Sequence, residues 1–253
     1  MHYGKLKLCP VVAVFVFVFL LGSSDTIANY SAPETYRILF VGNSLTEANN
    51  LPLMVQELID STHSVRFEVH VVTLPGASLD DHWNSGESAR TIQGGKWNIV
   101  ILQQGPSALP ESRVVLVNAT RKFAPLIRES GATPALYMVW PAAERLGDFD
   151  AVRESYALAA RSVEGIFFPV GEAWRAAWRR NSKLALYSRD GFHPTIEGSY
   201  LAAIVIASML TDRSAHGLPS TIQIKDSVVK IAPSDAAVLQ DAADEAIRNF
   251  GHK

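Results

Sequence analysis

The stretch that decides the fold is Arg37-Ile38-Leu39-Phe40-Val41-Gly42-Asn43-Ser44-Leu45-Thr46. Residues 37–41 form a short apolar run that ends at a glycine, which predicts a buried strand followed by a sharp turn. Ser44 then stands just beyond the carboxyl end of that strand, where open α/β sheets carry their chemistry. A serine in this place is a candidate nucleophile if a base can reach it.

Strand-like and helix-like segments alternate along the rest of the chain. The predicted strands are 37–41, 65–73, 97–102, 134–140 and 166–170; the predicted helices are 51–59, 114–128, 149–163, 172–180, 195–210 and 234–250, with another starting at Ser78. The strand segments are mostly apolar, as in parallel sheets that are covered on both faces. We therefore expect an α/β fold, a three-layer α/β/α sandwich with a parallel sheet of about five strands.

Length and composition favour one globular domain. The chain has 253 residues, of which 48% are hydrophobic and 19% charged, and its formal net charge is −2. It contains no basic run of the kind that binds a phosphate backbone, so we expect no nucleic-acid partner. Residues 29–253 are predicted to form a single domain that ends in a helical tail at about 213–253, with a small strand at 227–231. The oligomeric state stays open.

Residues 1–28 resemble a secretory signal peptide. Two lysines precede an unbroken apolar run at 11–21, and small residues follow. The run is shorter than the roughly 20 residues that a transmembrane helix needs. We expect cleavage after Ala28 and a secreted or periplasmic protein without a stable membrane span; an uncleaved N-terminal anchor is the alternative. Cys9, the only cysteine, would leave with the signal, so thiol catalysis is not expected.

Asp190-Gly191-Phe192-His193 offers the base that Ser44 needs. Histidine titrates near neutrality, and a nearby carboxylate can hold its ring in one tautomer. Asp190 can fold back onto His193 because Gly191 makes a turn easy. Both Ser44 and His193 would then meet at one edge of the sheet.

Other chemistries find little support in the sequence. There is no Walker loop, no Gly-x-Gly-x-x-Gly after the first strand and no His-Glu-x-x-His, so we expect neither a cofactor nor a metal. His82, beside Asp80 and Asp81, is better explained as part of a solvated helix start. Asn49 and Asn50 are expected in a mobile loop after the nucleophile.

Two blocks of the sequence resemble the GDSL, or SGNH, hydrolase superfamily. Gly42-Asn43-Ser44-Leu45-Thr46 resembles its first block, with Asn43 where Asp is commoner, and Asp190-Gly191-Phe192-His193 matches its final Asp-x-x-His block. The resemblance covers roughly residues 37–210. It implies a flavodoxin-like three-layer fold and ester hydrolysis through an acyl-enzyme. Ser44 would be the nucleophile, His193 the general base and Asp190 the residue that orients it.

The same resemblance implies an oxyanion hole. The family uses the N–H of the serine, the N–H of a glycine after the second strand and an asparagine side chain after the third. Ser44 and Gly76 match the first two, but Gln103-Gln104-Gly105 replaces the block that holds the asparagine. Gln104-Gly105 resembles the pair found in a carbohydrate acetylesterase branch, and a glutamine amide can donate the same hydrogen bond. Gln104 is the first candidate donor and Gln103 the alternative, since strand alternation points one of them inward.

The expected function is a serine hydrolase that cleaves carboxylic esters. By the same resemblance, its substrate is a small-molecule or carbohydrate ester, with carbohydrate O-acetyl groups as the first candidate. A lipid acyl-esterase or thioesterase is the alternative within this chemistry. A non-catalytic sugar- or lipid-binding module on the same fold is the alternative outside it.

Overall fold

The computed structural model describes Met1, residues 35–62 and residues 65–251. Apart from Met1, the predicted signal peptide lies outside these ranges. The main sheet has five strands in the order β2-β1-β3-β4-β5, and every neighbouring pair is parallel. Its strands are β1 (Tyr36–Gly42), β2 (Phe67–Thr73), β3 (Ile99–Leu102), β4 (Thr133–Tyr137) and β5 (Ile166–Phe168). The predicted parallel sheet is confirmed.

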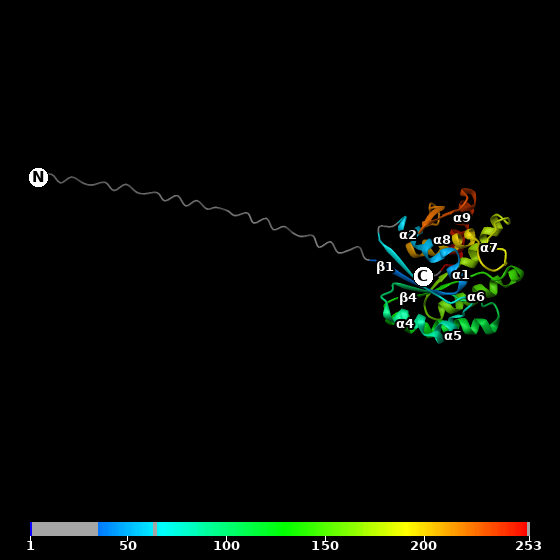
Figure 1. Ribbon diagram of the computed structural model, residues 1–253, viewed down its shortest axis with the longest axis horizontal. Coiled ribbons are helices and arrows are strands. Elements are labelled where there is room, and N and C mark those ends of the chain that lie inside the picture. Colours follow the sequence, from blue (N-terminus) through cyan, green and yellow to red (C-terminus); the bar gives the residue numbers. More distant parts are fainter. Residues whose placement is uncertain (2–34, 63–64, 252–253) are drawn as a thin grey trace. The chain divides into compact units, whose positions relative to one another are not determined.

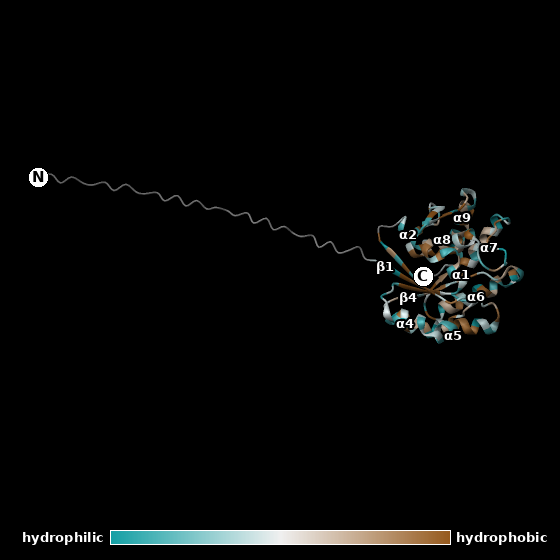
Figure 2. Ribbon diagram, in the orientation of Figure 1, coloured by the Kyte–Doolittle hydropathy of each residue, from teal (hydrophilic) through white to brown (hydrophobic). Residues whose placement is uncertain are grey.

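Helices cover both faces of the sheet (Figure 1). One layer contains α2 (Leu51–Asp60), α7 (Val170–Arg180), α8 (Ile196–Thr211) and α9 (Pro233–Phe250). The other contains α3 (Leu79–Ser85), α4 (Glu87–Gly94), α5 (Pro110–Glu129) and α6 (Phe149–Arg161). Figure 2 shows strongly hydrophobic strands between the two helical layers. Because both faces of the sheet are buried, its central strands are apolar throughout, and the predicted three-layer sandwich is confirmed.

Helix α8 is the most deeply buried of the described helices. Nearly every residue from Gly198 to Met209 is buried, which explains why it is apolar all round instead of amphipathic. Thr195 caps its start, since the threonine Oγ1 accepts a hydrogen bond from the N–H of Gly198. A Cβ atom at Gly198 would lie 2.6 Å from the Leu186 carbonyl oxygen, so this position needs glycine. The helix therefore fixes the chain immediately after His193.

The tail differs from the predicted helical one. Residues Thr221–Ile224 (β6) and Ser227–Lys230 (β7) form an antiparallel hairpin before α9 begins. Lys225, at the turn, has a positive φ of 51°, and the strand before it alternates buried isoleucines with exposed polar residues. That alternation is the signal for a half-buried strand. The strand predicted at 227–231 is present as β7 and the helix predicted at 234–250 as α9, so the only addition in this part of the described chain is β6.

The sheet order places several loops beside one another. Strand β1 lies between β2 and β3. The strand order therefore reverses at β1, with β2 on one side of it and β3, β4 and β5 on the other. The carboxyl ends of strands at such a reversal form the crevice in which open α/β sheets bind ligands. Ser44, Gly76 and Gln104 follow β1, β2 and β3, respectively. None of the helices within the described ranges is long and apolar enough to cross a membrane.

Candidate active site

Ser44 is held in a tight turn at the end of β1. Asn43 caps the short helix α1 (Ser44–Glu47), because its Oδ1 accepts a hydrogen bond from the N–H of Leu45. A Cβ atom at Gly42 would lie 2.4 Å from Thr46 Oγ1 and 2.5 Å from Gln103 Oε1. The close approach of these two side chains therefore requires glycine at position 42. A positive φ is not the reason, since Gly42 does not have one.

His193 lies between Ser44 and Asp190. Its Nε2 is 2.9 Å from Ser44 Oγ, and its Nδ1 is 2.6 Å from Asp190 Oδ2. An ionised carboxylate can only accept hydrogen bonds, so Nδ1 carries the proton and Nε2 is left to accept one from the serine hydroxyl. Ser44 and His193, which are 149 positions apart in the sequence, are therefore brought into contact, and the side chains follow the order hydroxyl, imidazole, carboxylate.

Asp190 is organised by its own loop. Its Oδ1 accepts hydrogen bonds from the N–H groups of Phe192 and His193, each at 3.0 Å, and from Ser188 Oγ at 2.7 Å. The hydrogen bond from His193, followed by that from Ser188, holds the pKa of the Asp190 carboxyl well below its usual range. Gly191 completes the turn with a φ of 68°. The carboxylate is therefore ionised and fixed in direction, although its side chain is 49% exposed.

Two backbone N–H groups lie in the turns at the carboxyl ends of β1 and β2. Ser44 contributes one, and Gly76, with a φ of 70°, contributes the other. Leu74 N–H donates to the Gly42 carbonyl oxygen at 3.1 Å, which connects the Gly76 turn to the turn that carries Ser44. In the part of the chain that the structure describes, neither N–H has a hydrogen-bond partner, so both are free to bind an oxygen of a ligand.

The two glutamines after β3 have different surroundings. Both side chains are buried, with Gln103 1% and Gln104 3% exposed. Gln103 Nε2 donates one hydrogen to Asn43 Oδ1 and the other to the Gln104 carbonyl oxygen, so neither remains for a ligand. Gln104 Oε1 accepts from the N–H of Leu79, and its Nε2 donates to Ser107 Oγ. One amide hydrogen of Gln104 thus remains, and the geometry favours Gln104 over Gln103 as a third donor.

No family model and no curated protein matches the chain, but solved structures do. A DUF4886 family protein from Bacteroides uniformis has a TM-score of 0.70 and 19% identity, covering 85% of this chain and 96% of its own. A protein from Slackia heliotrinireducens assigned to the SGNH hydrolases has a TM-score of 0.58 and 28% identity, covering 70% of this chain and 100% of its own. This similarity supports placing the chain in the SGNH hydrolase superfamily.

Further solved structures share the fold of this chain at lower identity. The acetyl xylan esterase AlAXEase has a TM-score of 0.55 and 14% identity, over 70% of this chain and 98% of its own. At that identity the likeness concerns the fold alone. Among the described residues, no group of three or more His, Cys, Asp or Glu side chains is arranged to hold a metal ion.

His82 has a different place from the one predicted. Its side chain is fully buried, with Nε2 2.8 Å from the Gly42 carbonyl oxygen and Nδ1 2.8 Å from Ser88 Oγ. A carbonyl can only accept, so Nε2 carries the proton and Nδ1 accepts from the serine hydroxyl. The spacing from buried Leu79 was an available signal, because residues three apart share one face of a helix. The solvated helix start is therefore correct for Asp80 and Asp81 but wrong for His82.

Asn49 also has a defined role in place of the expected mobile loop. Its φ is 55°, and its Nδ2 lies within hydrogen-bond distance of the Pro194 and Thr195 carbonyl oxygens and of Ser199 Oγ. Asparagine tolerates the left-handed backbone better than most residues, so its type was a signal for the conformation. Nothing in the local sequence indicates partners about 145 residues away.

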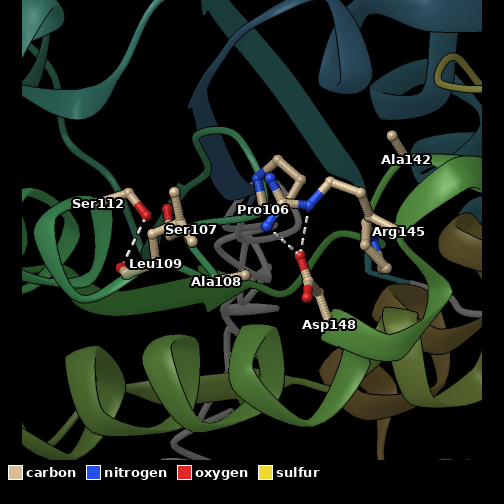
Figure 3. Close-up of a pocket in the computed structure, with 9 residues that line it drawn as sticks. Pro106, Ser107, Ala108, Leu109, Ser112, Ala142, Arg145 and Asp148 are labelled. Carbon is tan, nitrogen blue, oxygen red and sulfur yellow. Dashed lines mark hydrogen bonds and ion pairs between the residues drawn. The ribbon is translucent and has the colours of Figure 1, made fainter.

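A cleft of about 190 Å³ lies between the loops that follow β3 and β4 (Figure 3). Pro106, Ala108 and Pro141 supply apolar parts of its wall. The loop after β4 is bound to the His193 loop, because the N–H of Ala143 donates to the Gly191 carbonyl oxygen at 2.8 Å. The cleft thus adjoins the loop that carries Asp190 and His193.

A charged pair also lines this cleft. Arg145 binds Asp148 through Nε and Nη2, both 2.6 Å from Oδ2, and the pair lies near Pro106 in Figure 3. Two of the five guanidinium hydrogens are used in this way. The cleft therefore combines apolar walls with donors that a hydroxyl-rich ligand can use.

Proposed function

We propose that this SGNH hydrolase cleaves carboxylic esters through an acyl-enzyme formed on Ser44. The observation that carries the proposal is the contact of His193 Nε2 with Ser44 Oγ at 2.9 Å, with Asp190 bound to the opposite ring nitrogen. A serine hydroxyl is a weak nucleophile until a base takes its proton, and an imidazole oriented by a carboxylate is suited to that task.

In the acylation step, Ser44 Oγ attacks the ester carbonyl carbon while its proton passes to His193 Nε2. The carbonyl π electrons move to the oxygen, which becomes an oxyanion. The N–H groups of Ser44 and Gly76 and the remaining amide hydrogen of Gln104 are its proposed donors. Collapse of this intermediate breaks the ester C–O bond, and the leaving alcohol takes the proton from His193.

Deacylation repeats the sequence with water as the nucleophile. His193 accepts a proton from water as the water oxygen attacks the acyl carbon, and the same donors stabilise the second oxyanion. Ser44 Oγ then leaves and recovers its proton from His193, which releases the carboxylic acid. Asp190 stays ionised throughout and stabilises the imidazolium that forms in each step.

For the substrate, we propose a short-chain ester, with O-acetylated carbohydrate as the first candidate. The cleft of about 190 Å³ lies beside the loop of Asp190 and His193 and is lined by neither Ser44 nor His193, so we assign it to the part of the substrate next to the reacting ester. The exposed donors of Arg145 suit sugar hydroxyls. The Gln104-Gly105 pair and the acetyl xylan esterases that share this fold also support the choice. A lipid acyl-esterase or thioesterase remains the alternative.

We also propose that the protein acts outside the cytoplasm, because its first 28 residues resemble a signal peptide.

The direct test compares the purified protein with Ser44→Ala on p-nitrophenyl acetate and on longer acyl esters. Ser130→Ala is a matched control, since Ser130 follows the carboxyl-terminal end of α5 and is not part of the site. We expect Ser44→Ala to lower kcat by at least about 10⁴-fold, because its nucleophile is missing. Equal rates for the two proteins would instead favour the non-catalytic binding module. A rate that rises with acyl length would favour the lipid acyl-esterase.

A further inference from the structure

One buried network of amides joins the three loops that carry the proposed oxyanion donors. The loops follow β1, β2 and β3, and the network consists of the side chains of Asn43 and Gln103 with the groups they bind. Asn43 is 5% and Gln103 1% exposed, so both amides are withdrawn from water. Buried polar groups are costly unless they are hydrogen-bonded, and here the partners lie on neighbouring loops.

Gln103 links the third loop to the first. Its Oε1 accepts from the N–H of Asn43 at 2.9 Å and from Thr46 Oγ1 at 2.6 Å. Its Nε2 donates to Asn43 Oδ1 at 3.0 Å and to the carbonyl oxygen of Gln104 at 2.6 Å. Both lone pairs and both hydrogens of this amide are therefore used. A side chain bound on all sides in this way has one orientation.

Asn43 links the first loop to the second. Its Oδ1 accepts from the N–H of Leu45 and from Gln103, and its Nδ2 donates to the carbonyl oxygen of Ala77 at 3.0 Å. The last of these bonds needs an N–H donor. An ionised aspartate at this position could accept the first two bonds, but it could not donate to Ala77 and would place a negative charge against a carbonyl oxygen. The bond to Ala77 therefore depends on the amide.

Three residues of this network, Asn43, Ala77 and Gln103, are each next in sequence to a proposed donor. Asn43 precedes Ser44, and Ala77 follows Gly76. Gln103 precedes Gln104 and also holds the Gln104 carbonyl. Stabilising an oxyanion requires donors that are placed before the reaction, and a misplacement of about 1 Å can cost 10²-fold in rate. Bonds that fix the neighbours thus fix the spacing of the donors themselves.

We propose that Asn43 and Gln103 are positioning residues that set the spacing of the oxyanion donors on the three loops. The amide of Asn43 is needed to hold the Gly76 turn through Ala77, and Gln103 holds Gln104 relative to Ser44. This role rests on the proposed ester hydrolysis. It differs from catalysis itself, because both amide hydrogens of Gln103 are used and the buried amide of Asn43 donates to Ala77.

The test uses Asn43→Asp and Gln103→Glu, each of which keeps the size of the side chain and removes its donors. Asn50→Asp is the matched control. It adds the same negative charge at an exposed residue close to α1. We expect kcat for p-nitrophenyl acetate to fall by about 10²-fold in both variants, with KM changed by less than about threefold. The control should keep its wild-type kcat.

A second readout separates positioning from a structural role. A trifluoromethyl ketone forms a tetrahedral adduct with the serine, and its oxyanion occupies the same hole. We expect its inhibition constant to rise about as much as kcat/KM falls, which a loss of folded protein alone would not produce. An unchanged inhibition constant, or an unchanged kcat in folded variants, would overturn the proposal.

Failure of the proposed function would look different. If the wild-type protein were no faster than Ser44→Ala, both the esterase and this role would be overturned. If Asn43→Asp did not fold, as judged by its thermal unfolding, Asn43→Ser would take its place, because serine still caps α1. The serine variant also loses the bonds to Ala77 and Gln103, so we expect the same loss of kcat, and a wild-type kcat would count against the proposal.

Discussion

Asn49 donates from its side-chain amide to the carbonyl oxygen of Pro194, the residue that follows His193, over a distance of 3.1 Å. The same Nδ2 lies 3.0 Å from the Thr195 carbonyl oxygen. Asn49 is five residues after Ser44, and both it and Asn50 have left-handed backbones, which other residues adopt at a cost of about 1–3 kcal/mol. The segment that carries Ser44, the proposed nucleophile, is thus bound directly to the segment that carries His193, the proposed base.

We expect Asn49→Asp to lower kcat by roughly tenfold or more, because the carboxylate cannot donate to either carbonyl and repels both. Loss of these bonds should also reduce the free energy of unfolding by about 1–3 kcal/mol. Asn50→Asp is the matched control, since Asn50 is exposed and has no side-chain hydrogen bond within the described residues. Steady-state kinetics and urea unfolding of both variants make the comparison, and equal kcat values would exclude a role for Asn49 in placing His193.

Gln104→Ala should lower kcat by about 10²-fold if the Gln104 side chain donates to the oxyanion. KM should change less, because the bond forms mainly in the transition state. Gln93→Ala, on the exposed face of α4, is the control for loss of a glutamine side chain. A folded Gln104→Ala variant with an unchanged kcat would leave the hole with its two backbone donors.

Gly42→Ala is expected to destabilise the protein by about 1–3 kcal/mol. The added methyl group would force apart Thr46 Oγ1 and Gln103 Oε1, which lie 2.6 Å from each other in a hydrogen bond. Gly94→Ala is the matched control, because a Cβ atom there has no neighbour within 4 Å. Thermal unfolding measures the difference, and equal melting temperatures would show that the network adjusts to the extra methyl group.

We expect His82 to make the free energy of unfolding depend on pH. Burial lowers the pKa of its imidazole, although the hydrogen bond to Gly42 and the charges of Asp81 and Glu87 partly oppose the shift. Below the unfolded-state pKa of about 6.5, the unfolded chain binds a proton that the folded chain does not. Stability is therefore fully present above that pKa and falls as the pH drops toward the lower folded-state pKa, by at most about 1.4 kcal/mol per pH unit.

His82→Gln removes this titration and keeps an N–H donor for the Gly42 carbonyl. We expect the free energy of unfolding of the wild type to fall more steeply between pH 7 and pH 5 than that of the variant. Urea unfolding at several pH values measures both slopes. Parallel curves would mean that His82 does not contribute to the pH dependence.

The sheet and its loops were predictable because their signals are local. Apolar runs such as 97–102 and 37–41 identify buried strands. The residue after each run lies at the carboxyl edge of the sheet, and this does not depend on how the helices pack. The same signals predict that Ser44 lies at the edge of the sheet. They do not predict the distance from Ser44 to His193, because that distance depends on how α8 packs.

The parts that could not be predicted depend on burial or on distant partners. Apart from Leu79 the sequence around His82 is acidic and polar, and the packing of α3 against β1 and α5 makes the face of Leu79 and His82 internal. Gln103 and Gln104 have the same side chain, so the sequence alone predicts either of them as the donor. Their difference comes from Asn43, Leu79 and Ser107, which belong to other loops or to a later turn.

The loop that carries Asp190 and His193 lies outside the main sheet. It is attached to the end of β4 by hydrogen bonds from Trp140 Nε1 to the Phe192 carbonyl and from Tyr187 OH to the Pro141 carbonyl. Such a loop can open locally at a free-energy cost below that of global unfolding. An ester hydrolase built in this way would lose activity at denaturant concentrations that leave its core folded, and would recover it each time the loop closes.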